Sequence, residues 1–125
     1  MTDSAAVGDW IDAYLVAWDS NEPADIAALF APDARYRFHP WDEPVVGPDA
    51  ITAAWLAGRD EAGDHRFTWR LVAVDGDTAV VQGRTEYTAG PVAGRVYENL
   101  WILVLPPQGR ATAFTEWYME QPAGG

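Results

Sequence analysis

The chain has no cysteine and no lysine, and its only histidines are His39 and His65. Without cysteine there can be neither disulfides nor thiolate chemistry, and without lysine there can be no Schiff-base mechanism. No carboxylate lies at the spacing from these histidines that known metal-binding loops or helices use, so we predict no metal site. No cofactor motif is present either, and we predict no cofactor.

Positive charge and long apolar runs are also scarce. All eight basic residues are arginine, against 19 acidic residues, and the net charge is −11. Such a surface repels phosphate backbones and anionic lipids, so we expect no nucleic-acid partner and no membrane partner. The longest apolar run, LWILVL, is too short to cross a bilayer. The N-terminus shows no signal-peptide pattern, and we predict a cytoplasmic protein.

Large apolar side chains are abundant. The chain has 125 residues, among them seven tryptophans, five tyrosines and four phenylalanines. This is too much hydrophobic area for a disordered chain, and the length fits a single domain over residues 1–125.

Three helices are predicted in the first half of the chain. Apolar residues recur at helical spacing over residues 7–18. A second helix begins at Pro23, is stopped by Pro32 and has Phe30 on its buried face. The third is expected over residues 48–58, between a proline and a glycine.

Strands are predicted mainly in the second half. Their alternating β-branched and aromatic residues place them at about 67–74, 78–88, 95–105 and 110–120. A short strand is expected within 34–40, a loop over 42–47, and a polar connection over 58–66. Helices followed by a meander of strands predict an α+β fold, with the helices covering one face of a curved sheet.

The strand over residues 95–105 is apolar on both faces toward its end. Leu100, Ile102 and Val104 lie on one face, and Trp101, Leu103 and Leu105 lie on the other. Such a strand needs a cover on each side. We therefore predict a homodimer that forms through the sheet.

Three charged residues lie where the predicted strands should bury only apolar ones. Arg84 and Glu86 share a face of one strand, and Glu116 lies on the last strand, on the face of Phe114 and Tyr118. A charge inside a sheet is costly unless it is paired. Together in a cavity, the three would be an acid, a base and the cation that organises them. The alternative is an exposed structural ion pair, worth at most about 1 kcal/mol.

Three segments stand out as motifs: ALFAPDARY, VGPDAITAAW and the closing GRATAFTEWYMEQP. Through them, nearly the whole chain resembles the SnoaL-like branch of the nuclear transport factor 2-like superfamily. The resemblance implies a cone-shaped α+β fold, in which three N-terminal helices pack on a curved, mainly antiparallel sheet around a deep pocket. The superfamily includes enzymes of several classes and non-catalytic domains, so the fold alone does not fix the reaction.

The charged residues partly resemble the site of the limonene-epoxide hydrolases. Those enzymes carry Arg-x-Asp on a middle strand and an Asp on the final strand, where this chain has Arg84-Thr85-Glu86 and Glu116. Tyr36 also matches, but Phe38 stands where an Asn is expected. The resemblance implies that Glu116 activates water, Glu86 protonates the epoxide oxygen, Arg84 holds both carboxylates and Tyr36 places the water.

Other residues are predicted to line a substrate pocket, although each is also compatible with an ordinary structural role. They are Tyr14, Trp18, His39, Trp55, Trp69, Asn99, Trp101 and Tyr118. His39 is also a candidate general base. Asn99 orients a ligand if its face is the inner one, and belongs to the dimer contact if its face is the outer one.

Three functions fit these features. The first is a small cofactor-independent enzyme acting on a hydrophobic small molecule, in its most concrete form by epoxide hydrolysis. The second is proton abstraction next to a carbonyl, as in ketosteroid isomerases and polyketide cyclases, with His39 or a glutamate as base and Tyr36 as donor. The third is a non-catalytic domain that binds a small ligand and dimerises.

Overall fold

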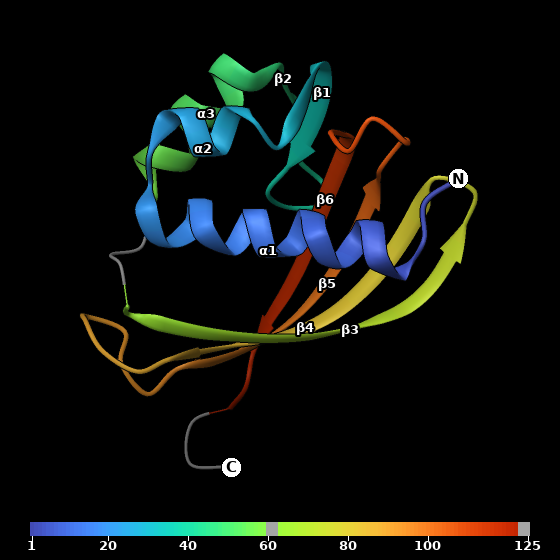
Figure 1. The fold of residues 1–125 in the computed structure, drawn as a ribbon. Coiled ribbons are helices and arrows are strands. Elements are labelled where there is room, and N and C mark those ends of the chain that lie inside the picture. Colours follow the sequence, from blue (N-terminus) through green and yellow to red (C-terminus); the bar gives the residue numbers. More distant parts are fainter. Residues whose placement is uncertain (60–62, 123–125) are drawn as a thin grey trace.

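The computed structural model describes residues 1–59 and 63–122. Helix α1 (Ser4–Ser20) lies across the concave face of a curved sheet (Figure 1). The carboxylate of Asp3 caps it by accepting a hydrogen bond from the backbone N–H of Ala6 at 2.9 Å. Asn21 ends it in the left-handed conformation. The short helix α2 (Pro23–Ala27) and helix α3 (Pro48–Ala57) lie toward one end of α1.

Six strands form one sheet in the order β2-β1-β6-β5-β4-β3. Their bounds are β1 Phe30–Arg37, β2 Val45–Val46, β3 His65–Asp75, β4 Thr78–Tyr87, β5 Val96–Val104 and β6 Ala111–Glu120. Neighbouring strands are antiparallel except β1 and β6, which pair in parallel. The predicted α+β fold, with helices over one face of a mainly antiparallel sheet, is confirmed.

The boundary between the second helix and the first strand differs from the prediction. Helix α2 ends at Ala27, and Phe30 begins β1 instead of extending the helix. Phe30 is nevertheless buried, as expected, at 1% exposure. The pairing of β1 with β6 shifts register between Phe30 and Arg35. Pro32 has no N–H to donate to a ladder, so it is accommodated in this irregular stretch of the strand.

The later strands begin and end within about two residues of their predicted bounds. The loop predicted over 42–47 is wrong in part, because Val45 and Val46 pair with Tyr36 and Arg35 as strand β2. Of the polar connection predicted over 58–66, residues 60–62 lie outside the described residues, and β3 already begins at His65.

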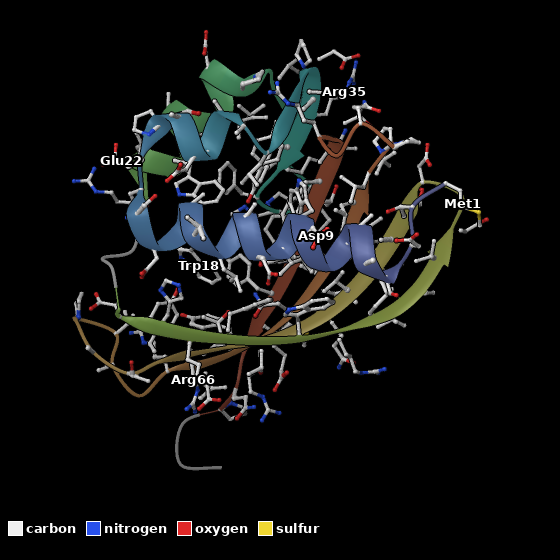
Figure 2. The ribbon with its side chains drawn as sticks, in the orientation of Figure 1. Met1, Asp9, Trp18, Glu22, Arg35 and Arg66 are labelled. Atoms are coloured by element: carbon white, nitrogen blue, oxygen red, sulfur yellow. The ribbon has the colours of Figure 1, made fainter. Side chains whose placement is uncertain are left out.

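The two faces of the sheet have different surroundings. Figure 2 shows Trp18 between α1 and the sheet, whereas Arg66 projects from the opposite face. The largest buried side chains, among them Trp101, Tyr36 and Phe114, fill the helix side. Within the part of the chain that the structure describes, no helix is both long and apolar enough to span a membrane.

Candidate functional site

A cavity of about 300 Å³ opens on the helix side of the sheet. Its walls come from α1, the end of α3 and strands β1, β4, β5 and β6, and are mostly aromatic. The lining residues are Tyr14, Trp18, Tyr36, Phe38, Trp55, Gly58, Arg59, Thr85, Tyr87, Tyr97, Asn99, Trp101, Glu116 and Tyr118. All five tyrosines of the chain are among them. This is the composition of a site for a hydrophobic small molecule with a few polar groups.

Among the described residues that line this cavity, Glu116 carries the carboxylate. It lies on β6 opposite Trp101 of β5, and the indole N–H of Trp101 donates a hydrogen bond to its Oε2 at 2.8 Å. The side-chain amide of Asn99 donates to the same oxygen, also at 2.8 Å. Oε1 accepts no hydrogen bond from the described residues. One oxygen is therefore held by the protein, and the other is left for a ligand.

The surroundings of Glu116 keep its proton more tightly bound than usual. Burial raises the pKa of the Glu116 carboxyl, because the charged form is poorly solvated. The hydrogen bonds from Trp101 and Asn99 and the proximity of His39 oppose this rise but do not cancel it. A carboxyl with a raised pKa next to an aromatic cavity is suited to accept and return a proton.

Asn99 is fixed by a neighbour on β4. The hydroxyl of Thr85 donates to Asn99 Oδ1 at 2.8 Å, so the amide nitrogen of Asn99 is the atom turned toward Glu116. Thr85 and Asn99 are both buried. The inner face of β5 is thus the one that carries Asn99, which settles the alternative left open by the sequence. Thr85 was not predicted, although it alternates with Arg84 and Glu86 along the strand.

Two phenol groups meet on the buried side of Glu116. The hydroxyls of Tyr14 and Tyr36 are 3.3 Å apart, and both side chains are buried. Burial and the nearby charge of Glu116 raise the pKa of Tyr36 well above its usual range. Tyr36, predicted as a catalytic residue, therefore remains a protonated phenol beside the carboxyl.

His39 lies behind the cavity wall instead of lining it. Its Nδ1 is 2.9 Å from Asp42 Oδ2, and its Nε2 is 2.8 Å from the hydroxyl of Tyr118. Tyr118 lines the cavity, two residues beyond Glu116 on the same face of β6. Sequence analysis missed Asp42, although it follows His39 closely in the loop after β1.

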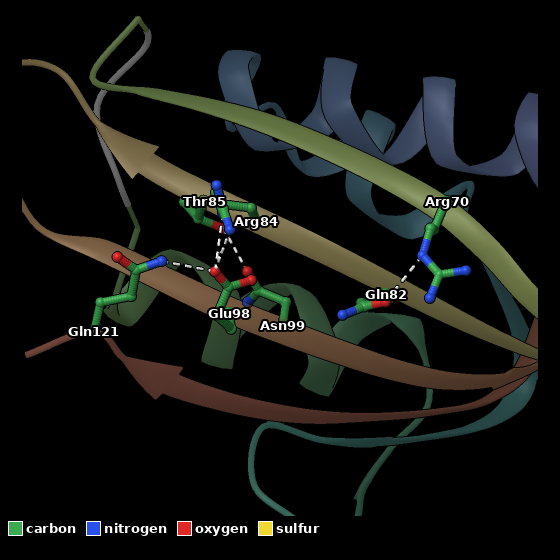
Figure 3. A network of polar contacts seen from close by, with 7 residues as sticks. All are labelled: Arg70, Gln82, Arg84, Thr85, Glu98, Asn99 and Gln121. Atoms are coloured by element: carbon green, nitrogen blue, oxygen red, sulfur yellow. Dashed lines mark hydrogen bonds and ion pairs between the residues drawn. The ribbon is translucent and has the colours of Figure 1, made fainter.

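The prediction that Arg84, Glu86 and Glu116 share a cavity is wrong. Arg84 lies on the opposite face of the sheet, where its Nε donates to Glu98 at 2.9 Å (Figure 3). Glu86 pairs with Arg66 at 2.9 Å on that same outer face. Neighbouring residues alternate along β4, so placing Thr85 in the cavity wall turns Arg84 and Glu86 away from it.

Trp69 is also misplaced by the prediction. Its indole packs against the core beside Gly8 of α1. If Gly8 carried a Cβ atom, that atom would lie 3.9 Å from the indole of Trp69. Trp69 is not among the residues that line the cavity with Glu116. The other predicted pocket aromatics, Tyr14, Trp18, Trp55, Trp101 and Tyr118, do line it. No group of three or more metal-ligand side chains occurs within residues 1–59 and 63–122.

Comparisons with known proteins agree with this architecture. Solved structures that share the fold include the following three. A ketosteroid isomerase-like protein from Erwinia carotovora atroseptica has a TM-score of 0.65 and 19% identity over 94% of this chain and 96% of that one. A proposed ketosteroid isomerase from Kribbella flavida has a TM-score of 0.68 and 23% identity over 100% and 87%. An NTF-2 like protein of unknown function from Silicibacter pomeroyi has a TM-score of 0.62 and 20% identity over 95% and 100%.

At these identities the structural likeness establishes the fold alone. Among curated proteins, none matches the chain. The protein-family model of the SnoaL-like domain matches residues 11–124 of this sequence. This range is nearly the entire chain and includes every strand of the sheet. The protein therefore belongs to the SnoaL-like domain family.

Proposed function

We propose that the protein catalyses proton transfer at a carbon next to a carbonyl group in a hydrophobic small molecule, as an isomerase or cyclase does. The observation that carries this proposal is Glu116. Among the described residues it is the carboxylate that lines the aromatic cavity, its pKa is raised, and its Oε1 accepts no hydrogen bond from them. Carboxylates tuned in this way are suited to general base catalysis.

The reaction step follows from the hydrogen bonds of Glu116. Asn99 and Trp101 hold Oε2, so Oε1 removes the proton from the α-carbon of the substrate. The electron pair of the broken C–H bond forms a C=C bond, and the carbonyl π electrons move to the oxygen, which becomes an enolate. A phenol of the cavity donates a hydrogen bond to this oxygen. Glu116 then returns its proton to a carbon of the enolate system, which regenerates the carboxylate.

The epoxide-hydrolysis mechanism is not retained. It requires a second carboxylate next to Glu116 as the acid, and Glu86 lies on the other face of the sheet, paired with Arg66. Proton transfer by a single carboxylate needs no such partner. The ketosteroid isomerase names of two structural neighbours favour the same reaction class, although their identities of 19% and 23% support only the fold.

The proposal is tested by exchange of substrate α-protons with deuterated water, followed by mass spectrometry across a panel of aromatic and alicyclic ketones. We expect Glu116→Gln to slow exchange by about 10²- to 10⁴-fold, the usual contribution of a general base. Glu86→Gln is the matched control, because it removes a carboxylate from the outer face and should leave the rate unchanged. Exchange that survives Glu116→Gln contradicts the mechanism. Ketones that bind without exchange identify a ligand-binding domain instead.

A further inference from the structure

Asp42, His39 and Tyr118 form a connected unit beside the cavity. The Asp42–His39 and His39–Tyr118 contacts are 2.9 and 2.8 Å long. His39 and Asp42 are each about one-third exposed, at 34% and 35% of their side-chain surface, so the unit reaches solvent. Its third member, Tyr118, lines the cavity. A hydrogen-bonded path therefore runs from the protein surface to the cavity.

The histidine ring is held in one orientation. The backbone N–H of Asp42 donates to the carbonyl of His39 at 3.1 Å, which closes the turn between them. Arg37 of β1 donates from Nε to the backbone carbonyl of Asp42 at 3.2 Å. The indole of Trp41 stacks on the imidazole, with ring centroids 5.0 Å apart and planes 12° from parallel. The orientation of His39 therefore depends on the turn as well as on Tyr118.

The chemistry of the partners determines which atoms carry hydrogen. A carboxylate only accepts hydrogen bonds, so Nδ1 of His39 donates to Asp42. A neutral imidazole then has a lone pair on Nε2, and the hydroxyl of Tyr118 must donate to it. A protonated imidazole donates from Nε2 to the Tyr118 oxygen, and the phenol proton becomes available to the cavity. The charge of His39 thus decides whether Tyr118 can donate to a ligand.

Tyr118 is well placed relative to Glu116. Two residues apart on one face of β6, their side chains leave the strand about 7 Å from one another. Partial burial, together with the charge of Glu116, raises the pKa of Tyr118, so its hydroxyl keeps its proton. By contrast, the phenol of Tyr36 is already in contact with the hydroxyl of Tyr14.

We propose that Tyr118, oriented by His39 and Asp42, is the donor that binds the carbonyl oxygen of the ligand while Glu116 faces the adjacent carbon. This assignment rests on the proposed function, since it names the group that stabilises the enolate oxygen. His39 is a positioning residue, and in its cationic form it turns the phenol proton of Tyr118 toward the cavity. Among the described residues, the charged and titratable groups that act on this unit are Asp42, Glu116, Tyr97 and Arg37, the last through the backbone carbonyl of Asp42.

Activity should therefore need Glu116 ionised and His39 protonated. The pH profile of kcat/KM is expected to change shape in His39→Gln, because the amide that replaces Nε2 neither gains nor loses a proton. A histidine that only supports the loop would leave the shape of the profile unchanged.

The rate test uses α-proton exchange of 2-acetylnaphthalene, an aromatic ketone. Tyr118→Phe should slow exchange by about 10- to 100-fold, less than the loss of a fully enclosed oxyanion donor, because Tyr118 is 45% exposed. The control is Tyr97→Phe. Tyr97 lines the same cavity, but its hydroxyl contacts Glu120 instead of His39, so this variant should slow exchange less than Tyr118→Phe does. An equal loss in both variants, or no loss in Tyr118→Phe, overturns the assignment and leaves the role of Glu116 standing.

A binding test separates this inference from the proposed reaction. Quenching of tryptophan fluorescence measures the affinity for 2-acetylnaphthalene and for 2-isopropylnaphthalene, which has a similar shape but no oxygen. The ketone should bind more weakly to Tyr118→Phe than to the wild type, because the variant lacks the phenol that donates to the carbonyl oxygen. The hydrocarbon should bind equally well to both. If this pattern appears without any proton exchange, the donor site stands and the proposed reaction fails. If the ketone binds equally well to both, the inference fails.

Discussion

Glu98 and Glu116 occupy adjacent strands but opposite faces of the sheet, and their surroundings differ in kind. Glu98 accepts hydrogen bonds from Gln121 and from the guanidinium of Arg84 in contact with water, and both donors lower its pKa. Glu116 also accepts two hydrogen bonds, but from neutral donors in an aromatic enclosure, and burial raises its pKa. The number of hydrogen bonds is therefore a poor guide to the state of a carboxyl. The charge of the donors and the access of water decide it.

The largest effect of this difference between faces should appear in two tryptophans. Trp101 faces inward at 1% exposure, and Trp117 faces outward at 37%. Trp101→Ala should lower the free energy of unfolding by about 3–5 kcal/mol, because it empties a core position. Trp117→Ala should lower it by about 1 kcal/mol or less.

Urea denaturation followed by circular dichroism measures both losses. Repeating it at two protein concentrations also tests the predicted homodimer through the outer face, since a dimer would make the effect of Trp117→Ala depend on concentration. If Trp101→Ala and Trp117→Ala lowered the free energy of unfolding equally at one low protein concentration, the predicted difference between the two faces of the sheet would be contradicted.

Gly83 gives a second test of the difference between the two faces of the sheet, because the ring of Phe67 approaches its backbone closely on the inner face. A Cβ at this position would lie 2.3 Å from Cζ of Phe67, whose ring stacks on Trp101 at 4.8 Å. Gly83→Ala should therefore cost about 1–3 kcal/mol of stability, because the ring of Phe67 must move. The neighbouring change Gln82→Ala, on the outer face, is the control and should have a smaller effect in the same denaturation measurement.

The two glutamates should respond to pH with opposite signs. Glu116 has a raised pKa in the folded state, so its contribution to stability is complete at low pH and is lost as pH rises through the folded pKa. Glu116→Gln should therefore raise the melting temperature at pH 8 relative to wild type and have less effect at pH 4. Glu98 has a lowered pKa, so its contribution is present at neutral pH and is lost on acidification.

Glu98→Gln should consequently lower the melting temperature slightly at pH 7 and have less effect in acid. The shift should be small because Glu98 is 38% exposed and its interactions are screened by water. Thermal unfolding across pH 4–8 measures both variants. Shifts of the same sign would show that the two carboxyls do not differ as described.

The smallest effect is expected for the outer ion pair itself. Arg84 and Glu98 are 52% and 38% exposed, and such pairs contribute about 0.2–1 kcal/mol. Arg84→Ala should change the free energy of unfolding by no more than this, and the difference should shrink in 1 M salt. Proton exchange should be unaffected, since Arg84 does not line the cavity with Glu116.

The fold could largely be predicted because the later strands alternate clearly and are separated by glycine and proline turns. The early part was harder to predict. Leu29 and Phe30 continue the apolar spacing of α2, and only the pairing of Phe30 with Ala111 on the distant β6 makes that residue part of a strand. Strand β2 consists of two residues whose pairing with β1 is not visible in local sequence.

The candidate site could be predicted in its walls but not in its charges. Alternation shows that Arg84 and Glu86 share a face, but it does not say which face is enclosed. The residues that alternate with them along β4 indicate the enclosed face. Thr85 and Tyr87 are less polar than Arg84 and Glu86, and they face the cavity. The resemblance to the limonene-epoxide hydrolases favoured the other face. Asp42 was missed because it reaches the site only through His39.

All five tyrosines line one cavity, so a spectroscopic label on tyrosine reports on that cavity alone. In protein grown with 3-fluorotyrosine, every ¹⁹F resonance would come from the cavity wall, and no signal from elsewhere in the molecule would overlap. Occupancy of the cavity can thus be followed through the fluorotyrosine resonances before any substrate is known. Because lysine is also absent, a dye that reacts with amines would label the amino terminus alone.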